Sequence, residues 1–178
     1  MYPGRKRLFL FAAYDARKTV GESLLWYLKA LSRLGDIVLA SDNEFSQSEK
    51  DKMSPYVLES ICQSHGEYDF GSYKRAFVWA TEHLDLSRYD YVYLVNDSVF
   101  GPLYDLSPAL CSMESSGRNA FALVENPSGH HPHLQSWFVG MKREIALGKD
   151  FKAFISSVQT VGSKLEVCQK YENGLTDV

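Results

Sequence analysis

An apolar run that ends abruptly in a carboxylate, Tyr91–Val95, constrains the fold of this chain more than any other stretch. Its side chains are all aromatic or branched aliphatic, which is typical of a strand buried on both faces of a mainly parallel sheet. Asn96, Asp97 and Ser98 follow at once, and Gly101-Pro102 closes a turn soon after. Ligands of open α/β sheets bind beyond the carboxyl ends of the strands. The stretch therefore predicts a site at Asp97, although Asn-Asp-Ser is also an ordinary way to begin a turn.

Short apolar runs alternate with helical patterns along the chain, and this alternation predicts a βαβαβ arrangement. The predicted strands lie at 8–13, 37–40, 56–62, 91–95, 120–124 and 136–141. Caps and capping pairs predict helix starts at Thr19 with Glu22, Ser46 with Glu49, Ser72, Ser107 with Pro108, and Ser163 with Glu166. The expected fold class is an α/β three-layer sandwich with a mainly parallel central sheet.

The composition favours a single domain and argues against several kinds of partner. The 178 residues, 45% of them hydrophobic, suffice for one core over 1–178 but not for two ordinary domains. The 19 basic and 22 acidic side chains nearly cancel, and no basic run is long enough for a nucleic-acid partner. Cys62, Cys111 and Cys168 form no CxxC pair, so a reducing cytoplasm fits better than a disulfide framework or a zinc site. No stretch approaches the roughly 20 apolar residues of a membrane span.

A loop rich in turn formers and ionisable groups, 64–72, runs directly into a helical stripe. With Ser72 as the expected cap, Gly71 and Ser72 would lie at a helix N-terminus, where backbone N–H groups can bind a phosphate. Lys74, in the first turn, could add positive charge. The plainer interpretation is that the glycines allow tight turns and that Lys74 lies on a solvated face.

Carboxylates that follow two of the predicted inner strands, Asp42 and Asp97, complete the layout of a nucleotide site. A nucleotide-sugar is one such ligand. Its diphosphate would need Mg²⁺ or Mn²⁺, held by a carboxylate such as Asp97. Displacement at the anomeric carbon also needs a base for the acceptor hydroxyl, and Glu125, Glu172 and Asp177 are the candidates in the second half of the chain.

Four sequence blocks resemble, in order, those of the rhamnan-synthesis F family of glycosyltransferases: His65–Lys74, Tyr89–Pro102, His133–Phe138 and Tyr171–Thr176. The resemblance implies a GT-A fold, a nucleotide-sugar donor that is often dTDP-rhamnose, and a glycan or lipid-linked glycan acceptor in surface polysaccharide assembly. It also implies a cytoplasmic location at the inner face of the membrane, with no span but with room for peripheral attachment. Family members usually carry further sequence on either side, so a minimal or truncated member is implied.

The resemblance also implies roles for individual residues. The block 96–98 stands where GT-A enzymes place their Asp-x-Asp metal and diphosphate motif, so Asp97 would be the metal ligand, but only one of the two usual acids is present. Asp42 stands where related enzymes contact the nucleobase or ribose, and Asp69 could assist there. Glu172 resembles the late acidic position that supplies the base in many inverting enzymes.

Two functions from different classes follow. The first is an inverting glycosyltransferase that uses these residues. The second is a GT-A-like binding or assembly module that recognises a nucleotide-sugar or glycan without transferring it, an alternative motivated by the missing acid and the short chain. Neither Gly-x-x-x-x-Gly-Lys-Ser/Thr nor Gly-x-Gly-x-x-Gly follows the first predicted strand, which argues against a kinase or a dehydrogenase.

Overall fold

The centre of the computed structural model, which describes residues 4–127 and 132–176, is a six-stranded sheet in the order β3-β2-β1-β4-β8-β5. The parallel strands are β1 (Arg7–Ala13), β2 (Asp36–Ser41), β3 (Glu59–Cys62) and β4 (Tyr91–Asn96). The strand β8 (Phe138–Lys142) runs antiparallel to both β4 and β5 (Ala120–Ala122). A separate ribbon pairs β6 (Glu125–Asn126) with β7 (His133–Leu134). The predicted class, an α/β fold with a mainly parallel central sheet, is confirmed.

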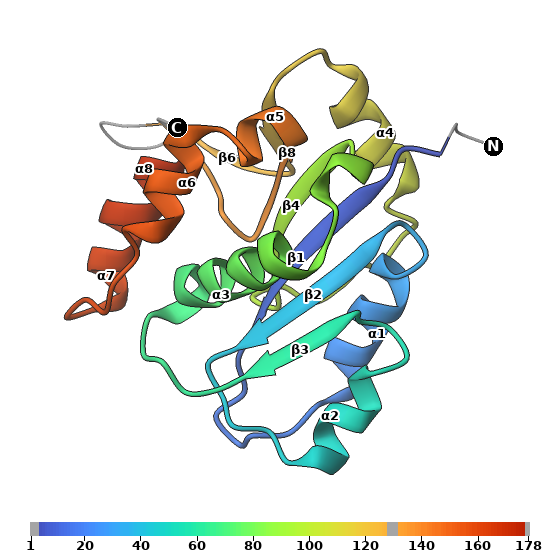
Figure 1. The fold of residues 1–178 in the computed structure, drawn as a ribbon, viewed down its shortest axis with the longest axis vertical. Helices are drawn as coiled ribbons and strands as arrows, with labels where there is room; N and C mark the ends of the chain where they lie inside the picture. The colour runs from blue at the N-terminus through green and yellow to red at the C-terminus, as the bar shows by residue number, and fades with distance from the viewer. Residues whose placement is uncertain (1–3, 128–131, 177–178) are drawn as a thin grey trace.

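Helices cover both faces of the sheet (Figure 1). One face packs against α1 (Glu22–Leu31), α2 (Gln47–Met53) and α4 (Ser107–Ser115). The other packs against α3 (Tyr68–His83), α5 (Arg143–Ala146), α6 (Lys149–Ser156), α7 (Lys164–Val167), a π-helical turn at Cys168–Glu172 and α8 (Asn173–Thr176). Within residues 4–127 and 132–176, no helix has the length and apolar character needed to cross a membrane.

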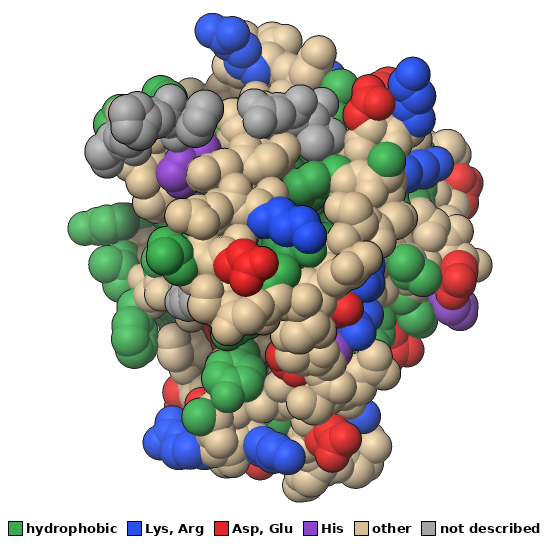
Figure 2. Space-filling view, turned by 90° about the vertical axis from the view of Figure 1, so that its left-hand side faces the viewer, with side chains coloured by type: hydrophobic (Ala, Val, Ile, Leu, Met, Phe, Trp, Pro, Cys, Tyr) green, Lys and Arg blue, Asp and Glu red, His purple; other side chains and the backbone are tan. Residues whose placement is uncertain are grey.

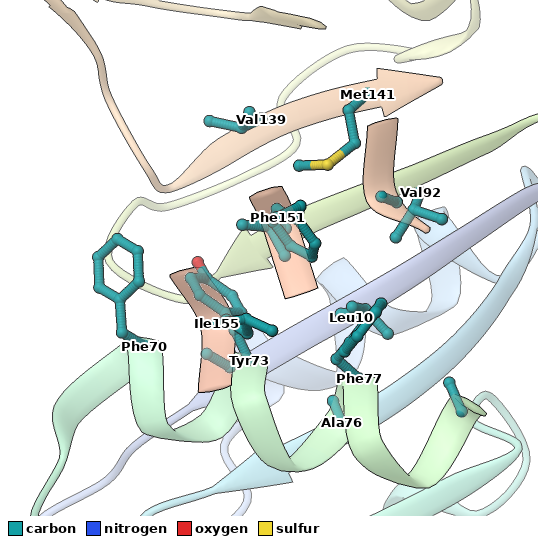
Figure 3. Close-up of a cluster of buried hydrophobic side chains, with 14 of the residues drawn as sticks. Leu10, Phe70, Tyr73, Ala76, Phe77, Val92, Val139, Met141, Phe151 and Ile155 are labelled. Atoms are coloured by element: carbon teal, nitrogen blue, oxygen red, sulfur yellow. The ribbon is translucent and has the colours of Figure 1, made fainter. Parts of the chain in front are cut away.

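Alternation of side chains along the central strands divides the core into two clusters. In β1, Leu10 faces α3 and α6, whereas Phe9 and Phe11 face α1 and α4. Figure 3 shows the first cluster, in which Phe77 of α3 and Phe151 of α6 lie close together, with ring centroids 5.4 Å apart. Helices on both faces explain why β1 and β4 contain continuous apolar runs rather than an alternating pattern.

One of the two capping pairs predicted in the first half is wrong. α1 begins at Glu22 without a side-chain cap, and the hydroxyl of Thr19 donates to Asp15 Oδ1 (3.4 Å) instead. Ser46 is confirmed as the cap of α2, because its hydroxyl accepts a hydrogen bond from the Glu49 N–H at 3.4 Å, whereas the Glu49 carboxylate accepts from the Val20 N–H at 2.6 Å instead of returning to Ser46. The difference arises because the loop before α1 closes on Asp15, a contact that the spacing of the residues does not reveal.

The later helix starts are close to those predicted. The Ser163 hydroxyl accepts from the Glu166 N–H at 3.3 Å before α7. Ser107 is the first residue of α4 rather than its cap, and Asp105 Oδ1 accepts from both the N–H and the hydroxyl of Ser107, at 2.9 and 2.7 Å. The acidic side chain two residues earlier thus replaces the predicted serine cap.

Candidate functional site

A cavity of about 660 Å³ lies at the carboxyl edge of the parallel strands. Loops after β1, β2 and β4 line it together with the start of α3 and the π-helical turn, and acidic side chains are visible on this side of the molecule in Figure 2. Because β8 is antiparallel, the segment before it begins at this same edge and also reaches the cavity. The cavity brings together these predicted site residues: Asp42, Asp69, Ser72, Asn96, Asp97, Ser98 and Glu172.

Asp97 lies partly buried directly after β4. Its Oδ2 accepts a hydrogen bond from the backbone N–H of Tyr14, 3.2 Å away, which ties the loop after β1 to the end of β4. Burial raises the pKa of Asp97 to about 7, and the charges of Asp69 and Asp15 add to this rise. The negative charge of Asp97 is therefore poorly compensated by the protein alone.

Asn96 directly precedes Asp97, and its side chain forms hydrogen bonds through both its amide nitrogen and its amide oxygen. Nδ2 donates to Asp69 Oδ2 at 3.0 Å, while Oδ1 accepts from the N–H of Ser98 at 3.0 Å. Asn96 is only 2% exposed, so these bonds are shielded from water. The amide thereby fixes the Asp69 carboxylate beside the Asp97 turn. An aspartate here would place another negative charge there and would lose the donated hydrogen bond.

Asp42 lines the cavity, but its carboxylate also binds the loop that leads into α3. It accepts from the backbone N–H groups of His65 at 2.6 Å and Gly66 at 3.0 Å, and from the Ser64 hydroxyl at 3.4 Å. Burial raises the pKa of Asp42, but these hydrogen bonds outweigh it and hold the pKa below its usual range. His65 in turn contacts the hydroxyl of Ser72 through Nε2 at 3.1 Å. Asp42 thus organises one wall of the cavity.

The start of α3 differs from the prediction. The helix begins at Tyr68, so Ser72 is not its cap. Gly71 is absent from the cavity lining, and its N–H donates to the Glu67 carbonyl at 3.1 Å, which contradicts the predicted use of that N–H for a phosphate. A Cβ at Gly71 would overlap the side chains of Glu67 and His65, which explains the glycine. Tyr68 has a φ of 55°, a left-handed value that is rare for an aromatic residue.

Lys74, the cation expected beside the phosphate, forms its hydrogen bonds outside the cavity. Lys74 does not line the cavity, and its Nζ donates to Glu67 Oε1 at 3.2 Å and to the Val158 carbonyl at 2.6 Å. Arg75 donates to the other oxygen of the same carboxylate at 2.5 Å. Burial raises the pKa of Glu67, but Arg75 and Lys74 more than offset this and lower it. The prediction that Lys74 faces the diphosphate is therefore wrong, because Glu67 attracts both cations.

Glu172 reaches the cavity from the π-helical turn at Cys168–Glu172, a form of helix that often occurs at functional sites. Its Oε1 accepts from the backbone N–H and the hydroxyl of Ser136, at 2.9 and 3.0 Å. Of the other predicted base candidates, Glu125 lies in β6 away from the cavity lining, and Asp177 lies outside the described residues.

Several lining residues are missed by the sequence reasoning, and most of them are aromatic or polar groups on loops. Tyr14, Tyr68, Ser136 and Trp137 all line the cavity. Ser136 and Trp137 fall within one of the family-like blocks, but the block gives them no role. Tyr14 directly follows β1, and the rule that ligands lie beyond strand ends could have identified it.

The described part of the cavity offers few metal ligands of its own. In the ranges that the structure covers, no group of three or more His, Cys, Asp or Glu side chains is arranged to hold a metal ion. Mg²⁺ commonly takes only one or two carboxylates and completes its shell with water and substrate phosphates. Asp97, with Asp69 held beside it by Asn96, matches this smaller requirement.

Comparisons with known proteins bear on the family. Among solved structures, the chain is similar to core-mannan synthase A from Aspergillus fumigatus in its Mn/GDP form, with a TM-score of 0.42 and 12% identity over 88% of this chain and 64% of that one. The chain therefore spans less than two thirds of that protein. Curated protein sequences give no match. The family model described as rhamnan synthesis protein F matches residues 37–178. Since this match covers most of the chain, the chain belongs to the family of rhamnan synthesis protein F.

Proposed function

We propose that this protein is an inverting glycosyltransferase that binds a nucleotide-diphosphate sugar in the cavity at the carboxyl edge of the sheet. The observation that carries the proposal is the meeting of Asp69, Asp97 and Glu172, from three distant segments, beside the rings of Tyr14 and Trp137. Polar groups next to flat apolar rings suit the polar edges and apolar faces of sugars and bases. Family membership favours dTDP-rhamnose as donor, a growing glycan as acceptor and a cytoplasmic site of action.

The charge of the cavity favours a divalent cation as the partner of the donor. Four carboxylates line it, those of Asp42, Asp69, Asp97 and Glu172, and no Lys or Arg is among the described lining residues. These acids would repel a diphosphate that arrived without compensating charge. Mg²⁺ or Mn²⁺ at Asp97, with Asp69 alongside, would bring that charge and stabilise the leaving diphosphate.

Glu172 is assigned as the base. Ser136 fixes its Oε1 with two hydrogen bonds, so the carboxylate has a defined orientation in the cavity. As the acceptor oxygen forms a bond to the anomeric carbon, the bond from that carbon to the diphosphate breaks. The proton of the acceptor hydroxyl passes to Glu172, and the configuration at the anomeric carbon inverts.

Donor binding and sugar transfer by matched variants test these roles. Thermal shift with dTDP-, UDP- and GDP-sugars, with and without Mn²⁺, identifies the donor, since a ligand at a hundred times its Kd stabilises a fold by about 2.7 kcal/mol.

Asp97→Ala should lose Mn²⁺-dependent donor binding. Glu172→Gln should keep donor binding and slow transfer about a hundredfold or more. Glu125→Gln, an acid away from the cavity lining, is the control and should match wild type. Equal transfer by wild type and Asp97→Ala would refute the role of Asp97.

A binding module that holds a nucleotide-sugar or glycan without transferring it is the second candidate. The observation that favours it is that the block 96–98 contains a single acid, Asp97. Nucleotide-sugar binding by the wild type with no turnover across a panel of acceptors would support this module. Any transfer that depends on Glu172 would exclude it.

A further inference from the structure

His65 is a buried ionisable residue to which the proposed mechanism gives no role. Its side chain is only 1% exposed, so the protein itself must provide the partners of both ring nitrogens. The residue lies in the loop before α3, and its backbone N–H is bound by Asp42. A Cβ at Gly71 would come within 2.8 Å of the imidazole Cε1, which shows that the ring packs directly against α3.

The hydrogen bonds of this imidazole determine which nitrogen carries the proton. Nδ1 accepts a hydrogen bond from the backbone N–H of Glu67 at 3.1 Å, whereas the Asp42 carboxylate, at 3.7 Å, is too far for one. A nitrogen that accepts has no proton of its own. Burial, together with the charge of Arg75, holds the pKa of His65 below its usual range, so the ring is neutral. The proton is therefore on Nε2, which lies 3.1 Å from the Ser72 hydroxyl and donates to it.

The hydroxyl of Ser72 accepts this bond through its oxygen and still has its own proton to donate. Among the residues that the structure describes, none accepts a hydrogen bond from this hydroxyl. Ser72 lines the reaction cavity and is only 1% exposed, so it lies at the bottom of the cavity. The hydroxyl proton is therefore available to an oxygen of a bound ligand, at a place shielded from water.

The position of Ser72 on α3 indicates which part of the ligand it would meet. Ser72 follows Asp69 by three residues, so the two side chains lie on the same face of the helix. Asn96 holds the Asp69 carboxylate beside the turn at Asp97, where the metal and the diphosphate are proposed to bind. No Lys or Arg is among the described lining residues, so neutral donors such as this hydroxyl must supply the protein's own share of positive potential.

We propose that His65 is a positioning residue that directs the Ser72 hydroxyl at a phosphate oxygen of the nucleotide-sugar. This inference rests on the proposed glycosyltransferase function and names a new contact to its diphosphate. The sequence prediction for Ser72 concerned backbone N–H groups at a helix N-terminus, whereas this contact uses the side chain. The hydrogen bonds run in one direction, from the Glu67 N–H through the imidazole to the hydroxyl, and each donor polarises the next. Such a chain favours an anionic oxygen at its end.

Binding of nucleoside diphosphates by single variants tests both roles. Titration calorimetry with dTDP, UDP and GDP in the presence of Mn²⁺ identifies the diphosphate that wild type binds most tightly. Ser72→Ala should weaken its binding about tenfold. Mn²⁺-pyrophosphate should lose affinity for Ser72→Ala by a similar factor. An unchanged affinity for pyrophosphate, beside a loss for the nucleotide, would show that Ser72 contacts the nucleoside and would overturn the proposal.

Two replacements of His65 separate the functions of its two nitrogens. His65→Asn keeps an oxygen near the Nδ1 position that can accept from the Glu67 N–H, but it has no donor for Ser72, so binding should weaken about fivefold. His65→Gln places an amide N–H near the Nε2 position and should bind within about threefold of wild type. It leaves the Glu67 N–H without its acceptor, so it should have the lower Tm of the two. An order of affinity opposite to the order of stability is not expected from a purely structural role.

The double variant His65→Asn, Ser72→Ala completes the test. If His65 acts through the hydroxyl, the double variant should bind as tightly as Ser72→Ala alone. Additive losses would overturn the proposal, and so would His65→Gln binding no better than His65→Asn, because His65 would then only hold the loop before α3. The matched control is His83→Asn, at the other end of α3 and away from the cavity lining, which should match wild type.

Binding by wild type separates this inference from the function on which it rests. If wild type binds a nucleoside diphosphate and Ser72→Ala binds it equally well, the roles of Ser72 and His65 are refuted and the glycosyltransferase proposal stands. This comparison holds even where the His65 variants do not fold, since Ser72→Ala removes a single oxygen. If wild type binds no nucleoside diphosphate or nucleotide-sugar under any metal condition, the glycosyltransferase proposal fails, and the role of His65 fails with it.

Discussion

Glu114 of α4 joins that helix to β1 and β4 through a buried cluster of charges. Its carboxylate accepts from Arg7 Nε at 2.5 Å and Nη2 at 2.8 Å, from Arg5 at 3.2 Å and from the Tyr93 hydroxyl at 2.6 Å. The Glu114 side chain is 0% exposed and that of Arg7 is 11% exposed. Burial raises the pKa of Glu114, but hydrogen bonds from Arg7 and Tyr93 outweigh it, so the pKa lies below its usual range. Removal of this one charge would leave a nearly buried guanidinium without its counter-ion.

Glu114→Gln should therefore lower the free energy of unfolding by about 3–5 kcal/mol, the usual penalty for leaving one partner of a buried pair. For a domain of this size, that corresponds to a fall in Tm of roughly 6–20 °C. The matched control is Glu144→Gln, which removes an ion pair of 2.7 Å to Arg143 whose acid is 64% exposed. Its cost should be only about 0–1 kcal/mol. Urea unfolding at neutral pH measures both.

The way in which the stability difference between wild type and Glu114→Gln changes with pH gives the result that would refute this reasoning. Since the folded pKa of Glu114 is depressed, its contribution to stability is present above the unfolded pKa of about 4.3 and is lost as pH falls through the folded value. The difference between wild type and Glu114→Gln should therefore shrink from about pH 6 to about pH 3. Equal costs for the buried and exposed variants, or a difference that stays constant over this range, would refute the reasoning.

Three further outcomes are expected. Gly140→Ala in β8 should cost about 1–3 kcal/mol in urea unfolding, because a Cβ there would overlap the ring of Phe121. Ser136→Ala removes the 3.0 Å hydroxyl bond to Glu172 and should lower kcat for transfer about tenfold, with donor affinity unchanged in calorimetry. Asn96→Asp places another negative charge in the acidic site, so it should lower Tm without metal and enlarge the stabilisation by Mn²⁺, which thermal shift records.

The class of fold can be predicted from the sequence because the burial of a strand determines the order of apolar and polar residues along it. The run at 91–95 is buried on both faces, and its continuous apolar character predicts this directly. The direction of β8 leaves no such pattern. Its residues Phe138–Lys142 form a short apolar run, and the partners it chooses, β4 and β5, depend on contacts between distant parts of the chain. The antiparallel pairing of β8 with β4 and β5 therefore cannot be predicted from local sequence patterns.

The candidate site likewise has one part that the sequence predicts and another that it does not. The position of Asp97 beyond a strand end could be predicted, because parallel strands place their carboxyl ends at one edge. The errors at Gly71 and Lys74 arise from two contacts in the loop before α3 and in its first turn. The start of α3 is set by Asp42, which binds backbone N–H groups of the preceding loop, and by Glu67, which attracts the cations. Neither contact follows from capping preferences or local spacing.

The antiparallel insertion of β8 builds the cavity from two separate stretches of the chain. All of the described groups assigned to the donor lie before residue 99, whereas Ser136, Trp137 and Glu172 lie after residue 119. The two parts meet through the backbone ladder between β4 and β8 and through packed rings, such as Tyr93 against Phe138 and Phe70 against Tyr171. A chimera that replaces residues 119–176 with the matching segment of a relative would keep the main-chain hydrogen bonds of that ladder. Recombination could thus diversify acceptor preference only when the exchanged segment also preserves the rings that pack against the donor-binding half.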